Sequence, residues 1–193
     1  MVFGYYIIFY WYYRFHSIKR IRLLEIAIFT QMIGYFLAYE ISFLLMKLLV
    51  LILTSFSLFI FIYLVYNAIL IKNRVLFLIG PLFLIPYLIV LVQHLSLKLN
   101  NFPWLMSIRL LLTTFFISIT TAFFAQKPNS NTFSLLFASL LVLSNFILYS
   151  YDFFGMIYLR YEITLSSKVS TYLIIRYLIK NQNFTDTQNY TSN

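Results

Sequence analysis

The chain has 193 residues, of which 62% are hydrophobic and 10% are charged, with a net charge of +9. Soluble proteins carry roughly a quarter charged residues, so this composition indicates a membrane protein and excludes most classes of soluble enzyme. The chain also contains no cysteine, which excludes disulfides, thiolate metal sites, iron–sulfur ligation and cysteine nucleophiles.

The amino-terminal residues, 1–22, are predicted to form an arm at the membrane interface. The stretch from Val2 to Tyr13 is too short to span a bilayer upright, and its tyrosines and tryptophan favour the interface. A basic cluster follows, and the positive-inside rule places it on the matrix or cytoplasmic side. The cluster contains Arg14, Lys19, Arg20 and Arg22.

Residues 23–159 are predicted to form the transmembrane domain. Five apolar stretches follow one another there, each close to the ~20 residues that a helix needs to cross a bilayer. We expect spans at about 23–45, 48–71, 75–97, 105–125 and 132–152. Pro81 and Pro86 should kink the third span, because proline removes a backbone donor. The sequence KPNSN at 127–131 predicts a polar turn before the fifth.

Residues 160–193 are expected to form an amphipathic and polar tail. Apolar and basic positions alternate over 169–180, which favours an interfacial helix, and the residues after it are polar and linker-like. The fold class predicted from the whole chain is all-α: a polytopic integral membrane protein with about five transmembrane helices and a short amphipathic carboxy-terminal segment.

The positive charge lies mainly at the ends of the apolar stretches. This placement favours contact with anionic, cardiolipin-type lipid headgroups and argues against nucleic acid as a partner. We expect no cofactor or metal to be bound by this chain alone. His16 precedes the first span and His94 ends the third, so the two histidines should not lie at one depth and ligate a haem together.

Ionisable residues within spans carry a functional hypothesis, because they are costly in hydrocarbon. Glu40 and Lys47 are seven residues apart, which is about two turns and one face of a continuous helix, so they are candidates for a proton path. In the alternative, both lie at helix ends and extend to the headgroups. Glu25 is within one turn of the basic cluster and is expected to form a surface ion pair.

Arg109 and Asp152 complete the candidates for a proton path or an intramembrane ion pair. Arg109 is the one charge in the fourth expected span, and Asp152 ends the fifth. A single arginine in a helix is typical of the stator subunit of rotary ATP synthases, but the Asn and Gly-His pattern of that family is missing around Arg109. Pairing with a carboxylate of another subunit, or extension to the headgroups, is the alternative. No catalytic motif accompanies these residues, so no autonomous active site is predicted.

The residue usage bears on the origin of the chain. Phe (22) and Tyr (17) are abundant and Gly (4) and Pro (4) are scarce, so residues with A/T-rich codons are over-used. Protist mitochondrial genomes encode many hydrophobic chains of this kind, and an A/T-rich endosymbiotic bacterium is the alternative.

Residues 123–159 resemble the start of the mitochondrial NADH dehydrogenase subunit 6 family. In that family a helix ends in a short Ala-Lys-Asn-Pro-like turn, an apolar helix follows, and an acidic residue opens a Phe-rich third helix. Ala125, Lys127, Pro128 and Asn129 correspond to the turn, and Asp152, Phe153, Phe154 and Met156 correspond to the third helix. The resemblance covers about a fifth of the chain, and after DFFGMIYL the chain departs from the family with Arg160 and Glu162.

Together these patterns predict a structural or proton-path subunit of complex I (NADH:ubiquinone oxidoreductase) in the mitochondrial inner membrane. Its partners would be other membrane subunits of a large hetero-oligomeric respiratory complex, and lipids. A subunit of cytochrome c oxidase or ATP synthase, and a stand-alone small transporter or assembly factor, are the alternatives.

Overall fold

The computed structural model describes residues 2–17, 21–40, 44–68, 104–153 and 160–190. All secondary structure within these ranges is helical. The helices are α1 (Val2–His16), α2 (Arg22–Glu40), α3 (Leu44–Ala68), α5 (Trp104–Gln126), α6 (Ser130–Phe153) and α7 (Arg160–Tyr190).

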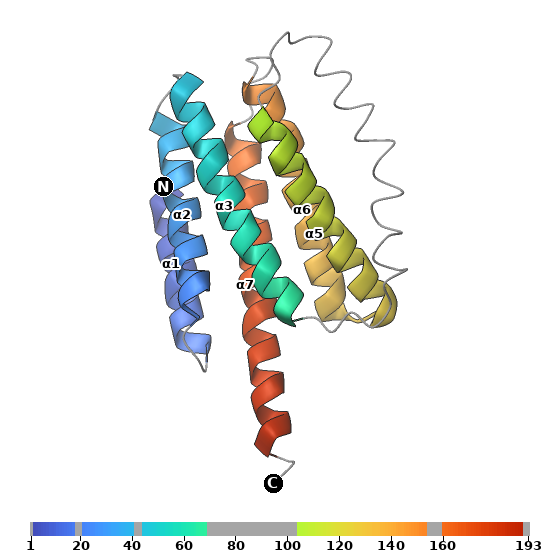
Figure 1. The fold of residues 1–193 in the computed structure, drawn as a ribbon. Coiled ribbons are helices and arrows are strands. Elements are labelled where there is room, and N and C mark those ends of the chain that lie inside the picture. Colours follow the sequence, from blue (N-terminus) through green and yellow to red (C-terminus); the bar gives the residue numbers. More distant parts are fainter. Residues whose placement is uncertain (1, 18–20, 41–43, 69–103, 154–159, 191–193) are drawn as a thin grey trace.

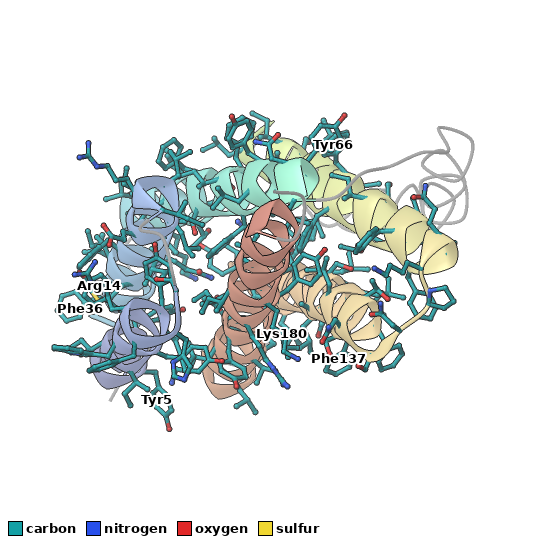
Figure 2. The ribbon with its side chains drawn as sticks, turned by 90° about the horizontal axis from the view of Figure 1, so that it is seen from below. Tyr5, Arg14, Phe36, Tyr66, Phe137 and Lys180 are labelled. Atoms are coloured by element: carbon teal, nitrogen blue, oxygen red, sulfur yellow. The ribbon has the colours of Figure 1, made fainter. Side chains whose placement is uncertain are left out.

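The helices form a bundle with α7 running through its middle (Figure 1). α1 and α2 pack together on one side, α3 packs against α2, and α5 and α6 form an antiparallel pair on the other side. Seen along the bundle, α7 lies between these two sides and contacts α1, α3 and α6 (Figure 2). The carboxy-terminal helix therefore links the two sides of the bundle.

Within the described residues, three helices are long and apolar enough to cross a membrane. They comprise Lys47–Ala68, Leu105–Gln126 and Ser130–Ser150, within α3, α5 and α6. The all-helical prediction is confirmed for the described residues, whereas the number of five spans is not confirmed. The span expected at 75–97, with Pro81 and Pro86, lies outside the described residues. A turn lies at 127–129, between the end of α5 and the start of α6, and Ser130 and Asn131 of the expected stretch 127–131 belong to α6.

The outer faces of the bundle are apolar and rich in aromatic rings. Along α3, every third or fourth residue is a large apolar side chain that is exposed: Leu49, Ile52, Phe56, Phe59, Tyr63 and Tyr66. In Figure 2, Tyr5, Phe36, Tyr66 and Phe137 project outward from four different helices. Water-soluble monomers rarely expose continuous apolar surface on this scale, so these faces are compatible with a multi-pass membrane protein.

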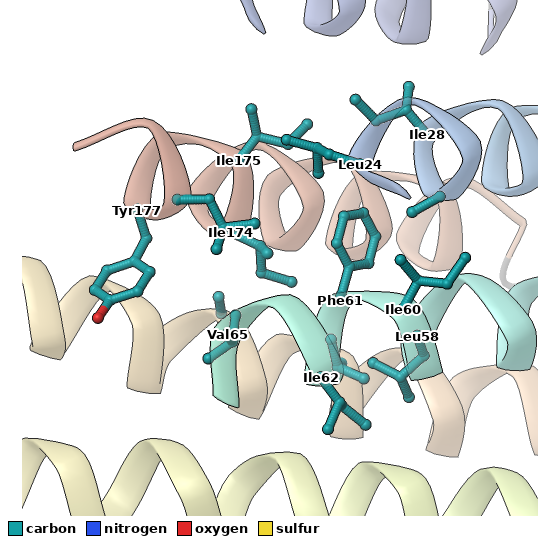
Figure 3. Close-up of a cluster of buried hydrophobic side chains, with 14 of the residues drawn as sticks. Leu24, Ile28, Leu58, Ile60, Phe61, Ile62, Val65, Ile174, Ile175 and Tyr177 are labelled. Carbon is teal, nitrogen blue, oxygen red and sulfur yellow. The ribbon is translucent and has the colours of Figure 1, made fainter. Parts of the chain in front are cut away.

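The interior contains one large apolar cluster in which α2, α3 and α7 meet. Phe61 of α3, which is 2% exposed, lies between Ile28 of α2 and Ile174 of α7 (Figure 3). In lipid, burying apolar groups gives no hydrophobic gain, so close packing must hold such helices together. Gly34 serves this packing: a Cβ there would lie 3.2 Å from Thr54 Cγ2 and 3.4 Å from Leu53 Cβ.

Two segments that the sequence places at the membrane surface are packed into the bundle. Tyr6 and Tyr13 of the expected arm are fully buried, because α1 packs on α2 and α7. In the expected tail, residues 163–180 line the interior with hydroxyl and isoleucine side chains. The interfacial position expected for 169–180 stays a prediction, and in the structure this segment packs along one face against other helices of the bundle. Its cations do face outward, but small Ser and Thr side chains on the other face let α7 approach its neighbours closely.

Candidate functional site

Arg109 lies at the centre of the buried polar groups. It is on the second turn of α5 and is 6% exposed. Its Nη1 donates a hydrogen bond to the carbonyl oxygen of Thr54 on α3. The Thr113 hydroxyl donates to the carbonyl oxygen of Arg109, at 2.9 Å. The guanidinium therefore faces the interior and joins α5 to α3. It does not extend to the headgroups, which was one of the two alternatives for this residue.

Gln31 makes a second polar junction, between α2 and α7. Its Nε2 donates to Ser167 Oγ at 3.2 Å, and its Oε1 accepts from Thr171 Oγ1 at 3.0 Å. The Tyr6 hydroxyl on α1 lies 3.4 Å from the same Ser167 oxygen. One amide thus uses both its donor and its acceptor, and the junction includes three helices.

Asn145 makes the third junction, between α6 and α7. It is 5% exposed, and its Nδ2 lies 2.7 Å from the carbonyl oxygen of Ile163 and 3.3 Å from Ser166 Oγ. Because buried polar groups are costly without partners, these bonds determine how α6 and α7 are aligned.

Two small cavities lie between these junctions and share three lining residues, Thr54, Arg109 and Asn145. Each offers about 10 Å³ to the centre of a water molecule, which is close to the space that a single water needs. The first extends to Gln31 and Thr171, and the second extends to Tyr149. Much of the remaining lining is apolar, especially in the second cavity. This volume has room for a single water molecule beside the shared polar residues and is too small for an organic substrate.

The structure separates Glu40 and Lys47, which the sequence places on one helix face. Glu40 is the last residue of α2 and Lys47 is in the first turn of α3, so the two residues lie on different helices and the condition of one continuous helix is not met. Their placement at helix ends agrees with the alternative interpretation. The Tyr149 hydroxyl donates to the Lys47 carbonyl oxygen at 2.7 Å, so Lys47 lies near the second cavity. The side chains of Glu40 and Asp152 are outside the described part, and their roles stay predictions.

Glu25 forms the ion pair that the sequence predicts, although not on the surface. Its Oε1 lies 4.0 Å from Nη1 of Arg14, and the Glu25 side chain is 9% exposed. The pair joins the end of α1 to the start of α2. It therefore anchors the amino-terminal helix on the bundle.

The amides Gln31 and Asn145 are not among the residues that the sequence singles out, because only ionisable side chains stand out within the apolar stretches. Each stands alone in an apolar stretch, and an amide in a span needs a partner for the same reason as a charge does. Nothing in the sequence indicates that the hydroxyls of Ser167 and Thr171 are buried, because their segment has the alternating pattern of a surface helix.

His16 ends α1 and is exposed, with Nδ1 3.0 Å from the Tyr12 carbonyl oxygen. His94 lies outside the described residues. Among the residues that the structure describes, no group of three or more His, Cys, Asp or Glu side chains comes together as metal ligands do.

The chain matches no protein-family model, no curated protein and no solved structure.

Proposed function

We propose that this chain is a multi-pass subunit of a respiratory-chain complex in the mitochondrial inner membrane, with complex I as the first candidate. The observation that carries the proposal is the distribution of side chains: large apolar groups cover the outside, and polar groups meet inside.

The outward face of α2 supports a role in assembly. Its exposed residues recur at helical spacing and are all large and apolar: Leu23, Ile26, Phe29, Ile33 and Phe36. A similar stripe runs along α3. A helix face that contacts only lipid chains requires no excess of aromatic side chains, whereas aromatic side chains are enriched where proteins contact one another. Other membrane subunits are therefore the expected cover for part of these faces.

The interior supports a scaffold. The junctions at Arg109, Gln31 and Asn145 join α2, α3, α5, α6 and α7 through hydrogen bonds. Such bonds between membrane helices are worth about 0.6 kcal/mol each on average, so several together hold one helix arrangement. The cavities found between them have room for water and none for a larger substrate.

The respiratory assignment itself rests on sequence. The excess of residues with A/T-rich codons favours a mitochondrial origin, and residues 123–159 resemble NADH dehydrogenase subunit 6. Complex I is the first candidate because a mitochondrially encoded hydrophobic subunit related to NADH dehydrogenase subunit 6 would agree with both indications.

Native electrophoresis tests the proposal. The tagged chain is extracted from mitochondrial membranes in mild detergent, separated on a native gel and stained in the gel for NADH dehydrogenase activity. We expect it to migrate with the active band and to co-purify with other complex I subunits. Migration as a lone species near its own 23.1 kDa mass plus detergent would contradict the proposal and favour a stand-alone transporter or assembly factor.

One observation favours a proton path as a second candidate function. The two water-sized cavities meet at Arg109 and Asn145 and extend towards Tyr149 and Lys47. In Arg109→Gln, a proton path predicts that fewer protons are pumped per NADH while the assembled complex persists. A scaffold predicts less assembled complex, with unchanged pumping by what remains. Lys168→Gln removes a positive charge at a residue that lines neither cavity and is the control for loss of a charge.

A further inference from the structure

The tertiary structure brings basic residues from three helices and one turn to one end of the bundle. The lower end of the bundle in Figure 1 contains the end of α1, the start of α2 and the turn between α5 and α6. α7 passes between them. Exposed cations gather here from segments far apart in the chain: Arg14, Arg22, Lys127, Arg176 and Lys180. We call them the basic end, and Figure 2 labels Arg14 and Lys180 in the view towards it.

A series of contacts shows that these residues share one end. The rings of His16 and Tyr12 lie 4.5 Å apart, and Tyr12 lies 5.5 Å from Tyr172 on α7. Arg176 and Lys180 follow Tyr172 at intervals of four, on the same face of α7. Lys180 Nζ then donates to Asn131 Oδ1 at 3.0 Å, in the first turn of α6. Lys127 lies just before, and its carbonyl oxygen accepts from Thr132 Oγ1 at 2.7 Å.

Little negative charge opposes this end. Among the side chains that the structure describes, Glu25 is the one carboxylate, and its side chain is 9% exposed beside Arg14. By their backbone positions, Glu40, Asp152 and Glu162 lie at the other end, where α2 and α6 finish and α7 starts, whereas Asp186 lies on the last part of α7, beyond Lys180. The bundle is thus polarised along its axis, with exposed positive charge at one end.

Exposed aromatic rings border the basic end. Trp11 is 55% exposed and Phe15 is 77% exposed, and their rings stack at 5.5 Å. Tyr66 is 51% exposed, near the end of α3. Tryptophan and tyrosine favour the headgroup level of a membrane. The rings therefore mark the depth at which phosphate groups would meet the cations.

We propose that the basic end binds the phosphate headgroups of anionic phospholipids and faces the matrix side of the membrane. Arginine and lysine suit this role, because guanidinium and ammonium groups donate several charge-assisted hydrogen bonds to phosphate oxygens. The proposal rests on the membrane location in the proposed function but does not require a respiratory partner.

Lipid binding to the full chain, purified in mild detergent, tests the headgroup site. Native mass spectrometry measures retention of cardiolipin against phosphatidylcholine. A basic residue near an anionic surface is worth about 1 kcal/mol, so Lys180→Gln should weaken cardiolipin retention about 5-fold, and Arg176→Gln with Lys180→Gln about 30-fold. Lys168→Gln is the matched control, since Lys168 is on the same helix but rests on the Tyr5 ring, 3.9 Å from its centroid.

Three results would overturn the headgroup site: equal loss in Lys180→Gln and Lys168→Gln, no loss in the double variant, or displacement of cardiolipin by millimolar inorganic phosphate. The last would indicate a site for free phosphate. Thermal unfolding of each variant separates loss of fold from loss of lipid. If the chain migrates alone on native gels yet keeps this lipid selectivity, the proposed function fails and the lipid site stands.

The absence of cysteine makes the orientation directly measurable. Ser130→Cys places one thiol at an exposed position of the basic end. In intact mitoplasts, a membrane-impermeant maleimide should label it only after the membrane is permeabilised. Labelling before permeabilisation would contradict a matrix-facing basic end.

Discussion

α3 and α7 lie side by side in the bundle and differ in what they present outward and inward. α3 is apolar along its length and exposes a stripe of large rings, with Ser57 bonded inward to the Ala27 carbonyl oxygen at 2.9 Å. α7 is far more polar in sequence, yet the hydroxyls of Ser167 and Thr171 are buried among its neighbours. The more polar helix is the more central one.

This difference shows that a long apolar sequence marks the helices that expose surface to lipid, and does not mark a helix that is packed inside the bundle. A helix at the centre of a bundle needs little apolar surface, because other helices surround it. Small hydroxyl residues serve there, since they let backbones approach and form hydrogen bonds between helices. Substitutions of buried residues should therefore lower the free energy of unfolding more than substitutions of exposed residues do.

The largest expected effect separates two arginines. Arg109→Ala removes the bond to the Thr54 carbonyl and leaves a cavity among polar groups, so the free energy of unfolding in mixed micelles should fall by about 2–4 kcal/mol. Arg176→Ala, on the exposed face of α7, should change it by less than about 0.5 kcal/mol. Equal stability of the two variants would mean that Arg109 is not part of the packed interior.

A smaller effect is expected where α2 and α3 approach each other. Gly34→Val would press a branched side chain against Thr54 and Leu53, and overpacking of this kind costs about 1–3 kcal/mol of unfolding free energy. Gly4 is the matched control, because a Cβ there meets nothing within 4 Å. If Gly4→Val destabilises the protein as much as Gly34→Val does, helix propensity rather than the close contact is responsible.

The smallest expected effect is the loss of one hydrogen bond between α2 and α7. A double-mutant cycle of Gln31→Leu and Thr171→Val should give a coupling energy of about 0.6 kcal/mol in mixed micelles, as is typical of hydrogen bonds between membrane helices. Thr114→Val replaces Thr171→Val in the control cycle, since Thr114 bonds back to the Leu110 carbonyl on its own helix. A coupling energy no larger than in the control cycle would count against the Gln31–Thr171 bond.

The candidate site could be predicted only in part. Arg109 is visible in the sequence because a lone charge in an apolar stretch stands out, and Glu25 could be paired with the basic cluster from its nearness in the chain. Gln31 and Thr171 are 140 residues apart, and no periodicity within either helix indicates that they meet. For Glu40 and Lys47 the sequence left two alternatives open, and the structure places them at the ends of two helices, since α2 ends at Glu40 and α3 begins at Leu44.

Length and hydropathy by themselves determined that α3, α5 and α6 are helices able to cross a membrane, because a backbone in hydrocarbon must satisfy its own hydrogen bonds. Helix boundaries such as the turn after Gln126 followed from local polar residues. Only the tertiary structure decided that α7 is central and that the exposed cations share one end. Both depend on which helix faces pack together, and packing joins residues whose separation along the chain carries no local signal.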